Sequence, residues 1–153
     1  MKHLQIGLLR SITIFNSSET KKASIEYEYI FQSEMVKKMF EFVRPQIVGV
    51  VNHNYPLLSD PERGILGIYI EFIYLKKNGL VQIADSFEKL IEIMTEINKV
   101  WDGKEGSYSL EKNEQTQRIS KIILQKIKNN NPNSDIDFWN YLCFRELSIY
   151  IKM

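Results

Sequence analysis

The chain has 153 residues, of which 44% are hydrophobic and 25% charged, and its formal net charge is +1. This length suits one domain spanning residues 1–153, and the composition is that of a folded globular protein. The near-zero charge excludes a general attraction to nucleic acid or to an anionic membrane, so a charge-based function must depend on a local patch.

A single cysteine, Cys143, lies in the apolar run FWNYLCF. One cysteine excludes an intrachain disulfide and a cysteine-rich zinc site, and its surroundings predict a buried side chain. No apolar run has the length of a transmembrane helix, and no small-residue cleavage site follows the N-terminal apolar stretch. We therefore expect a cytoplasmic protein, and the many Ile, Lys and Asn residues suggest a bacterial one.

The first segments predict two strands and a helix. Residues 4–15 contain the β-branched stretch ITIF, which favours a strand. Residues 24–31 alternate between apolar side chains and glutamates, which predicts a half-buried strand paired with the first in a hairpin. A helix over residues 19–31 is the alternative. Residues 33–43 carry an apolar stripe at helical spacing, and Pro45 ends that helix.

The middle of the chain predicts a loop between strands. Residues 46–51 read QIVGVV, a short apolar strand, whereas residues 52–63 contain two prolines and no periodicity, which predicts an irregular loop. Residues 65–75 are rich in Ile and Tyr and predict the next strand.

Asn78-Gly79 is the strongest short signal for a two-residue hairpin, with residues 80–84 as its returning strand. In this register Lys77 faces Leu80, and Tyr74 faces Ile83. The predicted buried face then consists of Ile68, Ile70, Phe72, Tyr74, Val81 and Ile83.

Helices dominate the second half. Asp85 or Ser86 is expected to cap a helix that ends near Trp101, with an apolar stripe of Phe87, Leu90, Ile91, Met94, Ile97 and Trp101. A helix over residues 109–128 should bury Ile119, Ile122, Ile123 and Ile127, and one from Asp135 to about residue 149 should bury Phe138, Trp139 and Leu142. Residues 147–151 fit a strand equally well. The expected fold is α+β, an antiparallel sheet with an Asn-Gly hairpin packed against three to four helices.

The two histidines, His3 and His53, have no second His or Cys at ligand spacing, so we expect no metal and no cofactor. His53 shares the predicted loop with Asp60, Glu62 and Arg63. A small enzyme or nucleotide-handling domain that uses the 52–63 loop is therefore one alternative function.

The helix over residues 109–128 is basic, with Glu111 and Glu114 at its start and Lys112, Arg118, Lys121, Lys126 and Lys128 after them. Acids first and bases last complement the helix dipole, which accounts for this pattern. A nucleic-acid-binding regulator that uses this helix is the second alternative.

An acidic cluster is the main candidate site. Glu88, Glu92 and Glu96 stand at successive i,i+4 positions, and Asp85 precedes them. Residues 85–105 hold six acids against three lysines, a local charge of −3. The hairpin register places Glu71 near the start of this helix. These five residues predict a partner-binding surface. A solvated helix face, with Glu71 as an edge-strand charge that resists aggregation, is the alternative.

In size, near-neutral charge, lack of a reaction motif and Ile/Lys/Asn-rich composition, the chain resembles bacterial immunity proteins that neutralise contact-delivered or polymorphic toxins. The resemblance covers the general character of the whole chain, and those proteins share no motif from which site residues could be carried over. It implies a protein that is not an enzyme and that inhibits a cognate toxin, often a nuclease, without itself binding nucleic acid or membrane. An acidic surface suits this role because it can cover a cationic active or substrate site.

Overall fold

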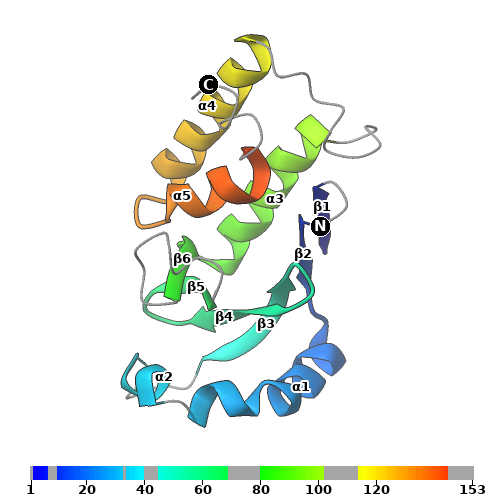
Figure 1. Ribbon diagram of the computed structural model, residues 1–153, viewed down its shortest axis with the longest axis vertical. Coiled ribbons are helices and arrows are strands. Elements are labelled where there is room, and N and C mark those ends of the chain that lie inside the picture. The colour runs from blue at the N-terminus through cyan, green and yellow to red at the C-terminus, as the bar shows by residue number, and fades with distance from the viewer. Residues whose placement is uncertain are drawn as a thin grey trace.

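The computed structural model describes residues 2–6, 10–32, 34–39, 45–68, 80–101 and 114–144. Their fold is α+β, as the sequence predicted. Six strands form one antiparallel sheet in the order β1-β2-β3-β4-β5-β6, so that each strand pairs with its neighbours in the chain. The sheet curls, with α1 and α2 below it and α3, α4 and α5 above it (Figure 1).

The bounds of two strands confirm the prediction, and one predicted strand is divided into two. Their bounds are His3–Ile6 for β1, Arg10–Ile14 for β2, Gln46–Val51 for β3, Tyr55–Asp60 for β4, Gly64–Ile68 for β5 and Leu80–Ala84 for β6. The bounds of β3 and β6 are those predicted. The first predicted strand, residues 4–15, is in fact two strands that pair with each other, with Leu4 opposite Ile12.

The predicted strand over residues 24–31 is wrong, and the helical alternative is confirmed. Residues Ser17–Glu26 form α1 and Glu28–Gln32 form a 3₁₀ helix, η1, followed by α2 at Glu34–Met39. A capping box starts α1, because the Asn16 side chain accepts the Glu19 N–H at 2.8 Å and the Glu19 carboxylate accepts the Asn16 N–H at 3.0 Å. The alternating apolar residues do not form a buried face, since Ile25 is 78% exposed.

The predicted loop over residues 52–63 is also wrong, because its centre is β4. A tight turn precedes this strand, with Asn52 and His53 at φ of 52° and 62°. Pro56 lies near the start of β4, and the pairing of β4 with β5 begins only at Leu57. The missing N–H of Pro56 therefore removes no bond from the described part of that ladder, which is how strands tolerate proline.

The pairing of β5 with β6 differs from the predicted register. Leu80 lies opposite Ile68, whereas Lys77 was predicted opposite Leu80. Residues 69–79, which include Asn78-Gly79, Phe72 and Tyr74, lie outside the described residues, so the hairpin turn stays a prediction. Ile83 is an extra residue in β6, because Ile65 faces Ala84 while Leu66 faces Gln82. Its carbonyl accepts the indole N–H of Trp139 at 2.8 Å.

The main core lies between the sheet and the helices α3 (Phe87–Trp101), α4 (Glu114–Asn130) and α5 (Ile136–Trp139), with a π-helical turn, η4 (Asn140–Phe144), after α5. Val81 and Ile83 are buried there as predicted. So are Leu90, Met94, Ile97, Ile123, Ile127, Phe138, Trp139, Leu142 and Cys143. A smaller cluster joins α1 to the other face of the sheet, formed by Ala23, Ile47, Leu58 and Leu66.

Two side chains predicted to point inward are exposed. Phe87 is 41% exposed, since it is the first residue of α3, and Ile93 is buried on that helix instead. Ile122 is 66% exposed because it lies beside the buried stripe of Ile123 and Ile127 and not within it. Within the described ranges, none of the helices combines the length and the apolar character needed to cross a bilayer.

Candidate functional site

The helix α3 carries most of the predicted acidic surface. Ser86 caps it: the Ser86 hydroxyl accepts the Lys89 N–H at 3.2 Å, and the Ser86 carbonyl accepts the Leu90 N–H at 3.0 Å. The helix then places Glu88, Glu92 and Glu96 one turn apart on the side away from the sheet. The fifth predicted residue, Glu71, lies outside the described residues.

Asp85 does not share the exposed face of α3. It is half-buried, and its N–H donates to the side-chain oxygen of Asn131 at 3.0 Å. Its Oδ1 atom is buried and has no hydrogen-bond partner in the structure. Asn131, itself 1% exposed, belongs to the turn between α4 and α5. Asp85 therefore contributes to the junction between sheet and helices, and the structure does not bring it to a partner surface.

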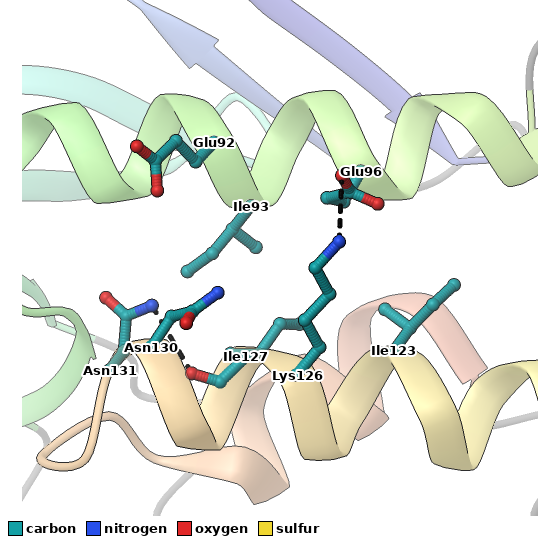
Figure 2. Close-up of a pocket in the computed structure, with 8 residues that line it drawn as sticks. All are labelled: Glu92, Ile93, Glu96, Ile123, Lys126, Ile127, Asn130 and Asn131. Carbon is teal, nitrogen blue, oxygen red and sulfur yellow. Dashed lines mark hydrogen bonds and ion pairs between the residues drawn. The ribbon is translucent and has the colours of Figure 1, made fainter.

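Glu96 connects α3 to α4. Its Oε1 atom lies 3.2 Å from Nζ of Lys99 and 3.2 Å from Nζ of Lys126. The Lys126 side chain extends from α4 toward Glu96 (Figure 2). Hydrogen bonds from Lys99 and then Lys126 lower the pKa of Glu96 and outweigh the opposing effect of burial. Two cations thus neutralise this carboxylate, which removes most of its attraction for a cationic partner.

Glu88 and Glu92, here called the glutamate pair, are exposed, and neither forms an ion pair with a described residue. Lys89 lies between them but its ammonium group donates to the carbonyl of Asn130. That carbonyl is at the C-terminus of α4, where the helix dipole favours a cation. The nearby lysines therefore have other partners. Of the four predicted residues that the structure describes, the glutamate pair keeps an exposed charge that no described residue pairs, and the place of Glu71 on this surface stays a prediction.

A small cavity of about 30 Å³ lies between α3 and α4, beside Glu92. Ile93, Ile123 and Ile127 form its apolar floor, and Glu92 and Asn130 stand at its rim (Figure 2). This volume has room for about two water molecules. Sites for cofactors and substrates measure roughly 300–1,000 Å³, so this cavity suits a single side-chain end of a macromolecular partner.

The structure separates the residues of the alternative loop site. His53 lies in the turn before β4, whereas Asp60, Glu62 and Arg63 lie at its other end. Five residue steps along β4, at about 3.3 Å each, separate the two groups by roughly 16 Å. His53 therefore lies beyond hydrogen-bonding distance of the other three side chains, and the alternative function that uses residues 52–63 stays a prediction. His53 Nε2 instead lies 3.5 Å from the hydroxyl of buried Ser11.

Asp60 has a structural role in the turn after β4. It accepts the N–H groups of Glu62 at 2.8 Å and Arg63 at 3.1 Å, and the Arg63 guanidinium at 2.8 Å. Burial alone would raise the pKa of Asp60, but these donors together outweigh it and lower the pKa. A carboxylate held in this way ends the strand and orients Arg63.

The basic helix, α4, has Arg118, Lys121, Lys126 and Lys128 and no acid between residues 118 and 130. Lys126 pairs with Glu96, and Lys128 donates to the carbonyl of Ser134 at 3.1 Å. Lys121 and Ile122 are both exposed on its outer side. Sequence reasoning missed the exposure of Ile122. Ile119, Ile123 and Ile127 already complete a stripe at spacings of four, which is the signal that could have placed Ile122 outside it.

Among the residues that the structure describes, no three His, Cys, Asp or Glu side chains are grouped so that they could hold a metal ion. Comparisons with protein-family models, curated proteins and solved structures gave no significant match to this chain. The geometry of the glutamate pair is therefore the basis for a functional proposal.

Proposed function

We propose that the protein is a protein-binding inhibitor, and that it is an immunity protein that neutralises a cognate bacterial toxin by covering a cationic active or substrate site. The observation that carries this proposal is the glutamate pair, two exposed carboxylates whose neighbouring lysines are engaged elsewhere. Charges left without an internal partner can be satisfied by a partner's cations at no cost to the fold.

The physics of association favours such a site for a fast, tight inhibitor. An anionic spot steers a cationic partner into contact, and charge pairs that lose water in the interface add specificity. A nuclease is a suitable target because its substrate site must attract phosphate groups. The proposed role is stoichiometric and non-enzymatic, and it needs no cofactor.

The proposed compartment is the bacterial cytoplasm, where an immunity protein would meet an incoming toxin. The only cysteine supports this location, since Cys143 is 3% exposed and forms no disulfide. Burial raises the pKa of its thiol, which leaves it protonated and inert.

The test is co-expression with the protein encoded by the adjacent gene. The wild-type chain should protect cells and form a complex of defined stoichiometry by light scattering. Glu88→Lys with Glu92→Lys should abolish protection. The matched control is Glu26→Lys with Glu34→Lys, which makes the same charge change at exposed sites on α1 and α2. Protection that survives in the first double variant, or fails equally in the folded control, contradicts the proposal.

A further inference from the structure

The two helices that border the glutamate pair run antiparallel. Lys89 contacts Asn130. Glu96 contacts Lys126, so residue numbers rise along α3 as they fall along α4 (Figure 2). Extending these two contacts places Lys121 level with residues 98–101 of α3. At a rise of 1.5 Å per residue, Lys121 lies roughly 9–14 Å further along the helix pair than Glu92.

The exposed surface of this helix pair has two different ends. The glutamate pair is at one end, and Lys121 and Ile122 are at the other. Lys121 and Ile122 border an open depression of about 520 Å³, which shares Lys126 and Asn130 with the small cavity beside Glu92. The two ends therefore belong to one continuous face, here called the α3–α4 face. Neither Glu92 nor Lys121 forms an ion pair with a residue in the described ranges.

A face with an acidic end and a basic end is complementary to itself after a rotation of 180° about an axis perpendicular to it. Most homodimers use this symmetry, in which the same patch on both copies makes two equivalent sets of contacts. We infer that two copies of this chain associate through the α3–α4 face, with Lys121 of each copy paired to Glu92 of the other. This inference goes beyond the proposed function, since it concerns the protein without its toxin.

Apolar contacts fit the same arrangement. A two-fold axis near the Glu96–Lys126 ion pair, which lies close to the middle of the face, brings Ile122 of one copy over the small cavity of the other. That cavity has a floor of Ile93, Ile123 and Ile127, and its volume of about 30 Å³ suits the end of one aliphatic side chain. The 66% exposure of Ile122 in the isolated chain is explained by this contact.

The size of the face limits the strength of the dimer. Two helices, each about 22 Å long and about 10 Å wide, together present roughly 450 Å². Stable interfaces bury about 800 Å² per partner, so the dimer is weak, salt-dependent and populated at high protein concentration. A toxin that binds Glu92 competes with it.

The test is sedimentation equilibrium of the purified chain at low and high salt. Glu92→Lys alone and Lys121→Glu alone should each lower the association constant at least tenfold, because each variant places like charges together twice. An equimolar mixture of these two variants should dimerise again, since both symmetric contacts then pair opposite charges. Ile122→Ser should also prevent dimerisation. As a matched control, a mixture of Lys21→Glu with Glu34→Lys should behave as the wild type does.

A wild-type chain that stays monomeric at low salt and high concentration overturns the inference. So does a dimer that these variants leave unchanged, or a mixture that associates no better than its components. Failure here is distinguishable from failure of the proposed function. Lys121→Glu and Ile122→Ser keep Glu88 and Glu92, so both should still protect cells from the toxin even when they no longer dimerise.

Discussion

The ammonium group of Lys126 on α4 lies 3.2 Å from the carboxylate of Glu96 on α3. This contact decides how the acidic surface is distributed, because it removes one of three aligned glutamates from the exposed charge. It also fixes the two helices beside each other, together with the bond from Lys89 to the end of α4. Stability and surface charge are therefore linked at this pair of helices.

Replacing Glu96 by Gln should lower the free energy of unfolding by about 0.5–1 kcal/mol, a modest value because the glutamate is 34% exposed and the ion pairs are screened. The pKa of Glu96 is lowered in the folded state. The contribution of Glu96 to the free energy of unfolding is therefore present above the unfolded pKa of about 4.3 and is lost as the pH falls through the folded pKa. Urea unfolding at neutral and acidic pH measures this. Glu34→Gln, whose pair with Lys37 spans 3.9 Å, is the control and should change little.

Asp60→Asn should cost about 1–3 kcal/mol at neutral pH, because Asp60 is 8% exposed and accepts several hydrogen bonds. Its pKa is lowered on folding, so the penalty should be full above the unfolded pKa of about 3.9 and should shrink as the pH falls through the folded pKa. Thermal melts across that range measure the difference. Glu62→Gln, at an exposed position two residues further along the same turn, should leave the stability unchanged. Equal effects of both substitutions would contradict the role assigned to Asp60.

Trp139→Phe should destabilise the attachment of α5 to β6. The indole N–H bonds the carbonyl of Ile83, the extra residue in β6, and its loss leaves a buried acceptor without a partner. We expect a loss of about 1–3 kcal/mol with an added packing term from the smaller ring. Native-state hydrogen exchange should show faster exchange of β6 amides, while those of β3 keep their protection relative to global unfolding. Uniform acceleration across both strands would show that the bond has no local role.

The sequence predicted those elements whose signals are local. The apolar runs of β3 and β6 and the stripe of α3 need no knowledge of distant residues. The helix α1 was predicted only as the alternative to a strand, because the alternation after Ser24 is typical of a strand, whereas the capping box at Asn16 and Glu19 favours the helix. The strand β4 was missed because Pro56 within it and Pro61 directly after it hide it, although the described pairing of β4 with β5 needs no N–H from Pro56.

The candidate site was only partly predictable for a related reason. The i,i+4 spacing of Glu88, Glu92 and Glu96 predicted that the three side chains lie on the same side of α3. Which of them keeps a free charge depends on cations from α4 and on Lys89 bonding the end of that helix. These contacts join residues distant in the chain, and no periodicity encodes them.

The glutamate pair should control how fast the toxin binds. Steering acts through long-range attraction, so Glu88→Lys with Glu92→Lys should slow association most at low ionic strength, with a smaller effect when salt screens the charges. The melting temperature should fall by no more than about 4 °C, since both side chains are exposed and only the interaction of Glu88 with the helix dipole is lost. Stopped-flow association at two salt concentrations, beside thermal melts, measures both. Glu26→Lys with Glu34→Lys is the control for net charge. If it slows association as much as the α3 double variant does, total charge and not the glutamate pair steers the encounter.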